Sequence, residues 1–395
     1  MAATSVSAYE FLSPARIVFG WGRLPEVGPL AAGIGGRAFL VVGSRTLAAY
    51  GILDALQDML RQNCVEPIVL ATIDREPLVA DVDRSVAEIR RHQVREGDMV
   101  IGLGGGSAID LAKAVAALAT NTAGATVGDY LEGVGRGLTI TERPLGVIAI
   151  PTTAGTGSEA TKNAVISSYD PPFKKSLRSE WMLPRVVVVD PQLAVSVPPA
   201  ITAQTGMDAI TQLIESYISR KARAIPRALA AGGLPLALGA IVEAVENGGS
   251  RPAREAMAQA ALVSGMALAN SGLGMAHGVA AALGVHHRVG HGLACATMLP
   301  ATLRTNRQIA ERQLAELARA AGLTCNSADS AAADALVGRI DEICEHLGVP
   351  QSLSELGVLH EDIPILVRDS RGNSMDGNPR TLSDVELSEI LEALL

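Results

Sequence analysis

Aromatic side chains are scarce in this sequence of 395 residues, which has two Trp, five Tyr and four Phe. Positive charge is also in deficit, because 33 Lys and Arg face 41 Asp and Glu and leave a formal net charge of −8. Proteins that bind nucleic acids need a basic surface, and those that bind single strands also need aromatic side chains on which bases stack. The composition therefore argues against nucleic acid as a partner.

Cysteine is rare too, and no Cys-x-x-Cys pair occurs among Cys64, Cys295, Cys325 and Cys344. This spacing argues against a disulfide framework or a structural zinc knuckle and favours a reducing compartment. The N-terminal segment lacks a basic stretch followed by an apolar core, and apolar runs such as 183–189 are much shorter than the roughly 20 residues that span a bilayer. We expect a cytoplasmic protein that does not enter a membrane.

Hydrophobic residues make up 48% of the chain and charged residues 19%, a balance typical of globular proteins. Up to about residue 195, short runs rich in Val and Ile alternate with longer amphipathic stretches, a pattern that predicts βαβ units and a parallel sheet. The predicted strands are Ala38–Val42, Pro67–Ala71, Met99–Leu103, Leu145–Ile150 and Arg185–Asp190, and the helices between them are Leu47–Gln62, Val82–His92 and Ala108–Thr120.

The strand pattern ends at Val197-Pro198-Pro199, where the paired prolines favour extended backbone. Helical patterns follow at Thr202–Arg220, Arg227–Asn247, Pro252–Asn270, Gln308–Ala321, Ser330–Leu347 and Ser383–Leu395, with a polar loop at Asp369–Arg380. We therefore predict two domains. Residues 1–197 form an α/β dinucleotide-binding domain with a Rossmann-like parallel sheet, and residues 198–395 form an all-helical domain.

Three glycines and a serine join a predicted strand directly to a predicted helix: Gly104, Gly105, Gly106 and Ser107. Glycine lets the backbone approach a ligand closely, and a helix N-terminus offers unpaired N–H groups and a positive dipole. The run therefore predicts a site for the pyrophosphate of a dinucleotide. A tight turn with a serine cap is the alternative, because the run matches neither G-x-G-x-x-G nor the Walker A pattern.

A second loop, Pro151–Thr161, is rich in Thr, Ser and Gly and also follows a predicted strand. Ligands of open α/β sheets bind beyond the carboxyl ends of the strands, where hydroxyl groups can hold ribose or phosphate. Such runs are commonly plain loops, so this loop supports a cofactor site only together with the glycine run before it.

Candidate metal ligands gather in the helical half. Asp208 and Gln212 lie four residues apart, so a helix presents both on one side. Four of the chain's seven histidines fall within one short segment: His277, His286, His287 and His291. Imidazole nitrogens and carboxylate oxygens suit borderline metals such as Fe²⁺ and Zn²⁺, whereas any single histidine is as easily a surface or core residue.

Taken together, these motifs resemble the iron-containing (group III) alcohol dehydrogenase family, which also resembles the glycerol dehydrogenases and dehydroquinate synthases. The resemblance covers nearly the whole chain. The matching residues are Val18-Phe19-Gly20-Trp21-Gly22, the GGGSAIDLAK run from Gly104, the PTTAGTGSEAT loop from Pro151, Leu183-Pro184 with Asp190-Pro191, Gly206-Met207-Asp208-Ala209, and the pairs His277-Gly278 and His291-Gly292.

The resemblance implies a dehydroquinate synthase-like architecture with a cleft between the two domains, and NAD(P)-linked interconversion of an alcohol and an aldehyde or ketone. It implies metal ligation by Asp208, His277 and His291, with Fe²⁺ favoured and Zn²⁺ the alternative. We expect cofactor contacts from the two loops and nearby positions: Ser44, Gly104, Gly105, Gly106, Ser107, Asp110, Thr152, Thr153, Thr156, Ser158 and Lys174.

Two positions depart from the family pattern. Gln212 stands where the family usually has a histidine four residues after the ligand aspartate, and Ala281 stands where a further histidine is common. Gln212 can still ligate the metal through its amide oxygen, although it is a weaker donor than imidazole. His287, or its neighbour His286, is a candidate for the proton relay that the second position loses.

The residues after the first predicted strand bear on the choice of cofactor. Family members that prefer NAD often have an aspartate there that binds the ribose 2′-hydroxyl, whereas this chain has Ser44 followed by Arg45. Serine and arginine accommodate a 2′-phosphate, so we expect NADP(H) in preference to NAD(H). Alternatively, Arg45 is only a solvated residue at the start of a helix.

We therefore expect a metal-dependent, NAD(P)-linked alcohol dehydrogenase or aldehyde reductase, in which the metal polarises the carbonyl and the nicotinamide transfers hydride. Few aromatic residues are present to line a cleft, so a small polar alcohol or aldehyde is the expected substrate. The expected catalytic residues are Asp208, His277, His291 and His287. The alternatives are a polyol or sugar-phosphate dehydrogenase of the same superfamily and a metal-poor, catalytically weakened dinucleotide-binding protein. The resemblance also suggests a homodimer.

Overall fold

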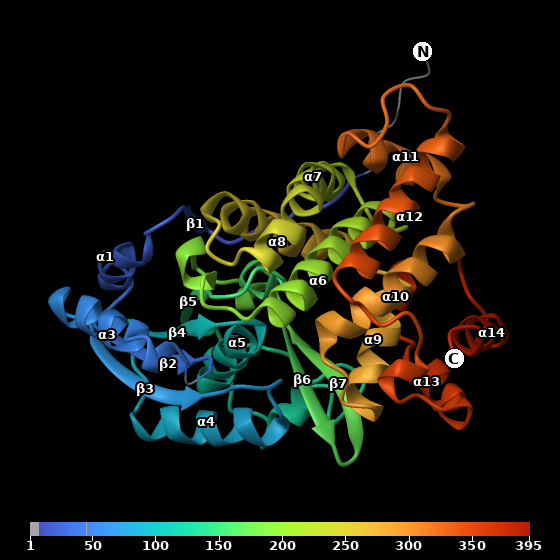
Figure 1. The fold of residues 1–395 in the computed structure, drawn as a ribbon. Helices are drawn as coiled ribbons and strands as arrows, with labels where there is room; N and C mark the ends of the chain where they lie inside the picture. The colour runs from blue at the N-terminus through green and yellow to red at the C-terminus, as the bar shows by residue number, and fades with distance from the viewer. Residues whose placement is uncertain (1–7, 45) are drawn as a thin grey trace.

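A six-stranded parallel sheet organises the N-terminal half of the computed structural model, which describes residues 8–44 and 46–395 (Figure 1). The strand order is β1-β8-β5-β4-β2-β3. The strands are β1 (Arg16–Phe19), β2 (Arg37–Val42), β3 (Glu66–Thr72), β4 (Asp98–Gly104), β5 (Gly146–Pro151) and β8 (Val186–Val189). All strands predicted from the sequence are confirmed, and β1 is an additional strand that pairs with β8.

Helices cover both faces of this sheet, which explains why its strands are continuous apolar runs. Alternate residues of β2 point to opposite faces: Phe39 and Val41 pack with α4 (Val79–Arg91) and α5 (Gly106–Thr120). Leu40 and Val42 pack on the other side with α1 (Val27–Ala32) and α3 (Ile52–Gln62). The result is the three-layer Rossmann-like arrangement expected from the alternation of strands and helices.

The strand order reverses at β2, which lies between β3 and β4 in the sheet. In such sheets a ligand binds beyond the carboxyl ends of the strands at the reversal. Gly43 follows β2 there, and its N–H donates to the Leu103 carbonyl at the end of β4 (2.7 Å). The topology therefore brings the predicted glycine run to the position where open α/β sheets bind ligands.

Two sequence expectations in this half are wrong in detail. The single helix predicted at Leu47–Gln62 is divided into α2 (Thr46–Ala49) and α3, because Gly51 between them has a left-handed φ of 71°. The predictions also missed an antiparallel hairpin of β6 (Asn163–Tyr169) and β7 (Pro172–Arg178). The hairpin projects from the sheet region and contacts α9 (Met275–His286) of the helical half (Figure 1).

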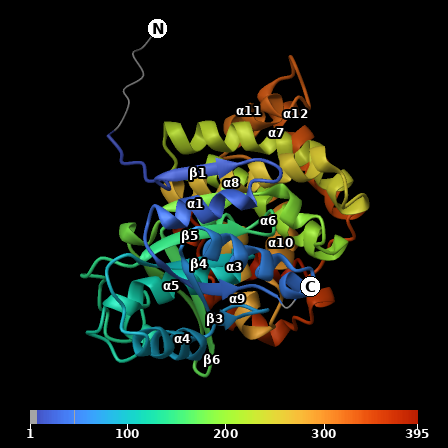
Figure 2. The same cartoon turned by 90° about the vertical axis from the view of Figure 1, so that its left-hand side faces the viewer.

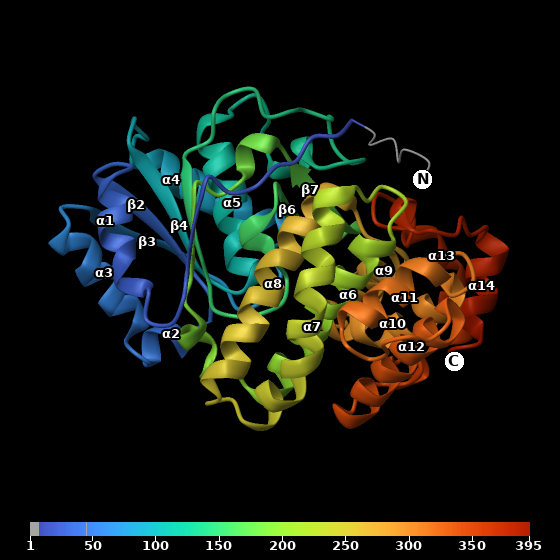
Figure 3. The ribbon, with the colours of Figure 1, turned by 90° about the horizontal axis from the view of Figure 1, so that it is seen from above.

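The C-terminal half is helical throughout its described elements and lies beside the sheet region (Figure 3). Besides α9, its helices are α6 (Pro199–Ile218), α7 (Ala224–Glu246), α8 (Arg251–Ser271), α10 (His291–Asn306), α11 (Glu311–Ala320), α12 (Asp329–His346), α13 (Ile363–Asp369) and α14 (Asp384–Glu392). The six helices predicted from the sequence are confirmed, whereas α9, α10 and α13 were not predicted. The expected loop at 369–380 contains a short 3₁₀ turn, Met375–Gly377.

Helix α7 is long and apolar enough to cross a membrane by length and composition alone. One side of α7 packs against α6 and α8, where residues such as Leu234 and Ile241 are fully buried in the core of the helical half. The core accounts for the apolar residues on this buried side, and 44% of the apolar stretch is buried.

The two halves meet along α8, where Ile17 and Phe19 of β1 pack with Ala258 and Leu262 (Figure 2). The last strand of the sheet ends at Val189 and α6 begins at Pro199, on either side of the expected boundary between 197 and 198. The exact position of the domain boundary stays a prediction.

Candidate metal and dinucleotide site

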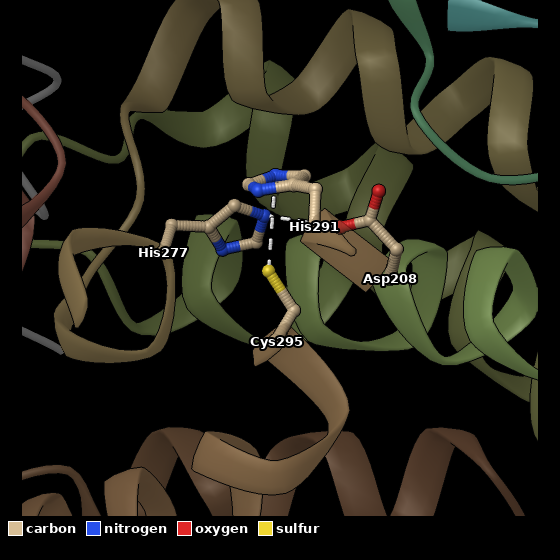
Figure 4. Close-up of side chains that lie close together, drawn as sticks. All are labelled: Asp208, His277, His291 and Cys295. Carbon is tan, nitrogen blue, oxygen red and sulfur yellow. Dashed lines mark hydrogen bonds and ion pairs between the residues drawn. The ribbon is translucent and has the colours of Figure 1, made fainter. Parts of the chain in front are cut away.

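Four side chains from three helices converge on one point in the helical half (Figure 4). They are Asp208 of α6, His277 of α9, and His291 and Cys295 of α10, and one donor atom from each lies within 4.8 Å of the others. The His277 Nε2 is 3.2 Å from the Asp208 Oδ1, and the Cys295 Sγ is 3.8 Å from the His291 Nε2. The structure thus brings together three of the four ligands expected from the sequence, without Gln212, and adds a thiol.

Local helix geometry explains this convergence. His277 lies in the first turn of α9 and His291 is the first residue of α10, so two separate helix starts face the buried Asp208 of α6. Cys295 follows His291 by four residues, which places both side chains on one side of α10. The sequence shows this spacing, although the scattered cysteines on their own do not indicate a metal donor.

Glu215 is a second residue that the sequence analysis missed. It lies seven residues after Asp208, on the same side of α6, and is fully buried. Its carboxylate accepts a 2.6 Å hydrogen bond from the His277 Nδ1 and further bonds from the backbone N–H groups of Gly274 and Ala276. Glu215 therefore fixes the orientation of the imidazole and directs its Nε2 toward Asp208, as carboxylates behind metal-binding histidines do.

The electrostatics of the group follow from burial and from these pairings. Burial alone would lower the pKa of His277, but Cys295, Asp208 and Glu215 together raise it well above its usual value. Burial and the nearby charge of Lys174 lower the pKa of His291 to about 4, so this imidazole is neutral at physiological pH. Burial raises the pKa of the Cys295 thiol to about 12, a value that a coordinated cation would reduce.

The donor set fits a divalent metal. Two imidazoles, a carboxylate and a thiol are the groups that Zn²⁺ and Fe²⁺ accept, and they are spaced for simultaneous contact with one ion. Glu215 provides the outer support that such sites need. The neutral His291 is in the protonation state in which imidazole binds metals.

Gln212, the expected fourth ligand, is engaged in other contacts. Its amide Oε1 accepts a 2.7 Å hydrogen bond from the Ser264 hydroxyl of α8. Its Nε2 donates to the Thr156 carbonyl of the threonine-rich loop at 3.3 Å. Gln212 therefore links α6 to both α8 and the threonine-rich loop.

His287 and His286 lie at the end of α9 and are directed to the C-terminal helices. The His287 Nε2 is 3.5 Å from the Asp362 carboxylate, and the His286 Nε2 is 2.7 Å from the Asp369 carboxylate. Neither belongs to the group of four donors found among the described residues. The proton-relay role of His287 stays a prediction.

The glycine run and the threonine-rich loop lie against each other. A Cβ on Gly106 would lie 2.6 Å from the Thr156 Oγ1, and one on Gly105 would lie 3.3 Å from the Thr153 Oγ1. All four residues remain partly exposed beside a buried sheet edge, at the start of α5. This small-residue surface at a helix N-terminus fits the pyrophosphate and ribose of a dinucleotide.

Lys113 is hydrogen bonded to the threonine-rich loop from its buried side. It is fully buried on α5, and its Nζ donates to the Ser158 carbonyl at 2.8 Å and to the Thr161 hydroxyl at 2.9 Å. Asp110 lies 3.0 Å from the same ammonium group and accepts from the Val165 N–H. Asp110 and Ser158, which were both expected to contact the cofactor, thus contact Lys113. Their direct contact with a cofactor stays a prediction.

Nearly the whole chain is matched by two sequence models of one family. The model described as "Iron-containing alcohol dehydrogenase" matches residues 14–191, and "Fe-containing alcohol dehydrogenase family, C-terminal" matches residues 202–395. The chain belongs to the iron-containing alcohol dehydrogenase family. The family resemblance expected from the sequence motifs is confirmed.

Individual members of the iron-containing alcohol dehydrogenase family are similar along their full length. The chain is 33% identical to long-chain-alcohol dehydrogenase 1 of Geobacillus thermodenitrificans over 97% of both chains. It is 30% identical to NAD-dependent methanol dehydrogenase of Bacillus methanolicus, over 98% of this chain and 100% of the relative. A crystal structure of 1,3-propanediol oxidoreductase superposes with a TM-score of 0.90 at 31% identity, covering 98% of this chain and 100% of that one.

Membership in the iron-containing alcohol dehydrogenase family confirms several expectations. The chain is an oxidoreductase that acts on CH–OH groups, in a family that uses NAD(P) and iron, and its substrates are small molecules. The expected two-part fold is also confirmed. The contacts expected for individual residues at cofactor and metal stay predictions.

Three of the remaining residues expected to contact the cofactor lie near the glycine run and threonine-rich loop or beside the metal donors. Thr152 is buried, and its N–H donates to the Gly104 carbonyl at 3.0 Å. Ser44 is exposed just beyond β2, whereas Arg45 lies outside the described residues. Lys174 of β7 forms a 2.6 Å ion pair with Glu76, so its charge near His291 is partly balanced.

Proposed function

We propose that this chain interconverts small polar aldehydes and their alcohols, with NADP(H) preferred to NAD(H), at a metal held by Asp208, His277 and His291. One observation carries the proposal. Gln212 is hydrogen bonded to the threonine-rich loop, which faces the glycine run, and it lies one helical turn from Asp208. The expected cofactor site, formed by the glycine run and this loop, therefore lies next to the metal donors.

Each group of residues has a defined task in this reaction. A divalent ion bound by the three side chains supplies Lewis-acid polarisation of the carbonyl, and the nicotinamide supplies the hydride. Glu215 keeps the proton of His277 on Nδ1 and leaves Nε2 available to the metal. Lys113 fixes the threonine-rich loop, so that Thr153 and Thr156 meet the cofactor in one arrangement.

The preference for NADP(H) rests on Ser44, which offers a 2′-phosphate a hydroxyl where a carboxylate would repel it. The relative from Bacillus methanolicus is described as NAD-dependent, so relatives of this similarity do not all share the proposed preference. The named substrates of the relatives range from methanol to long-chain alcohols. The proposal of a small polar substrate therefore depends on the composition of this chain.

The test is oxidation of NADPH and NADH against a panel of small aldehydes, before and after treatment with a chelator. We expect turnover that a chelator abolishes and that Fe²⁺ or Zn²⁺ restores, with higher kcat/KM for NADPH. Absence of turnover with every aldehyde and every metal, or turnover that survives complete metal removal, would contradict the proposal. Higher kcat/KM for NADH would overturn the cofactor preference alone.

We also propose that the protein is a cytoplasmic homodimer. The family resemblance supports the homodimer, and the scarcity of cysteine supports the cytoplasmic location. Light scattering coupled to gel filtration measures the oligomeric state directly. A monomer at micromolar concentration contradicts the homodimer.

A further inference from the structure

We infer that Cys295 is the fourth protein ligand of the metal and that Gln212 does not bind it. This inference rests on the proposed metal site, and it changes the donor set from the expected carboxylate, two imidazoles and amide to a carboxylate, two imidazoles and a thiolate. The consequence is a sulfur atom bound to the metal, which no expectation from the sequence included.

The first argument is distance. Metal–nitrogen and metal–oxygen bonds are about 2.0–2.1 Å long, and metal–sulfur bonds are about 2.3 Å long. In a tetrahedral site these lengths place a nitrogen and an oxygen ligand about 3.4 Å apart, and a nitrogen and a sulfur ligand about 3.6 Å apart. The corresponding separations are 3.2 Å between His277 Nε2 and Asp208 Oδ1, and 3.8 Å between His291 Nε2 and Cys295 Sγ. The sulfur therefore lies close to ligand spacing from the His291 nitrogen and within 4.8 Å of the other two donor atoms.

The second argument is direction and burial. Cys295 is fully buried and lies one turn after His291 on α10, and its sulfur faces the imidazoles of the group (Figure 4). A buried thiol that packed only as a small apolar group would need no polar neighbours. This one lies within 4.8 Å of a carboxylate oxygen and two ring nitrogens, a surrounding that suits a metal-bound thiolate.

The third argument concerns Gln212. The amide oxygen accepts from the Ser264 hydroxyl, and the amide nitrogen donates to the Thr156 carbonyl. A hydrogen bond from Gln212 also lowers the pKa of Asp208, so the amide turns its N–H side, and not its oxygen, to the metal ligands. Gln212 is also buried, so turning its oxygen to a metal would take the amide donor away from the Thr156 carbonyl, whereas the Ser264 hydroxyl would keep its bond to the Ala261 carbonyl. Cys295 reaches the site without breaking a contact of this kind.

The experiment uses the full-length protein loaded with Zn²⁺ or Co²⁺. X-ray absorption of the wild-type zinc protein should show one sulfur at about 2.3 Å from the metal. The cobalt protein should show the near-ultraviolet charge-transfer band of a thiolate bound to Co²⁺. A first shell of nitrogen and oxygen alone, or failure of the protein to bind either metal, would overturn the inference.

Three variants assign the sulfur. Cys295→Ser should lose the charge-transfer band and bind Zn²⁺ about 100-fold more weakly or worse, since loss of an outer-shell contact alone costs roughly 10–100-fold. Cys344→Ser is the matched control, because Cys344 is also fully buried but lies on α12 outside the group. Gln212→Ala should keep the band. A band that persists in Cys295→Ser, or disappears in Gln212→Ala, would overturn the inference.

Circular dichroism of the metal-free variants checks that they fold, and the X-ray absorption of the wild-type protein tests the inference even if Cys295→Ser does not fold. The outcomes also separate the inference from the proposed function. Turnover of aldehydes by a cobalt protein without a thiolate band leaves the function intact and overturns the ligand. A thiolate band without turnover of any aldehyde supports Cys295 as a ligand and contradicts the proposed function.

Discussion

At the scale of single residues, buried ionisable side chains hold the threonine-rich loop in place. Lys113 is fully buried between Asp110 and the loop carbonyls, and Glu159 of the loop is also buried. Burial raises the pKa of Glu159 to about 7, although the nearby Lys113 opposes the shift. The folded chain therefore holds a proton that the unfolded chain releases near pH 4.5.

This proton makes stability depend on pH. Because the folded pKa is raised, the contribution of Glu159 is fully present below pH 4.5 and is lost as pH rises through 7. Glu159→Gln keeps the neutral form at every pH, so it should match the wild type at pH 4.5 and exceed its stability by up to about 3 kcal/mol at pH 8. Urea denaturation at both pH values measures the difference.

Glu96→Gln is the control, because Glu96 is exposed and should show little difference at either pH. An equal effect of Glu159→Gln at pH 4.5 and pH 8 would show that Glu159 does not carry the proton.

Residue spacing in the sequence could have identified more of the site than it did. Glu215 follows Asp208 by seven residues and Cys295 follows His291 by four, and both intervals return a helical side chain to the same side. The contacts of Gln212 could not be predicted, because its partners Ser264 and Thr156 lie 52 and 56 residues away along the chain.

At the scale of elements, strong patterns were predictable and weak ones were not. The buried strands and the amphipathic helices α3, α4 and α11 have clear periodicity, and all were expected. Helix α9 is largely buried, with small and apolar residues that show no polar side, so its sequence has little helical periodicity. The hairpin β6–β7 contains Ser, Lys and a proline turn, which do not indicate a buried strand.

The contact between the glycine run and the threonine-rich loop gives a prediction at this scale. In Gly106→Ala the added methyl group would overlap the Thr156 side chain, and relieving it moves the loop. Overpacking of this kind costs about 1–3 kcal/mol, and the same cost in the cofactor complex weakens NADPH binding about 5- to 150-fold. Fluorescence titration of NADPH measures the affinity.

Gly338→Ala is the matched control, because a methyl group at this helical position meets no atom within 4 Å. It should leave NADPH binding unchanged. Equal affinity of the Gly106→Ala variant and the wild type would place the pyrophosphate away from the glycine run.

At the scale of the whole molecule, the metal donors tie together three helices that are separate in the sequence. The donors come from α6, α9 and α10; α10 packs against both of the others, and the three helices contribute to both cores of the helical half. The unfolded chain does not hold these groups together, so a bound metal stabilises the folded state by mass action.

We expect the metal-free protein to unfold at a lower temperature than the loaded one. Zn²⁺ at 100 times its Kd should add about 2.7 kcal/mol to the free energy of unfolding. Calorimetry of chelated and reloaded protein measures the shift, and Mg²⁺ at the same concentration is the control because it prefers oxygen ligands. Identical unfolding temperatures with and without Zn²⁺ would contradict a site built into the folded helices.

The hydrogen bonds of Gln212 have a consequence for how the enzyme fills its two sites. Gln212 connects the helix of Asp208 to the loop that faces the dinucleotide, so an ordering of either end is transmitted to the other. A metal that strengthens dinucleotide binding through this connection must itself be bound more strongly, by the same factor, when the dinucleotide is present. We expect the two to be retained or released together.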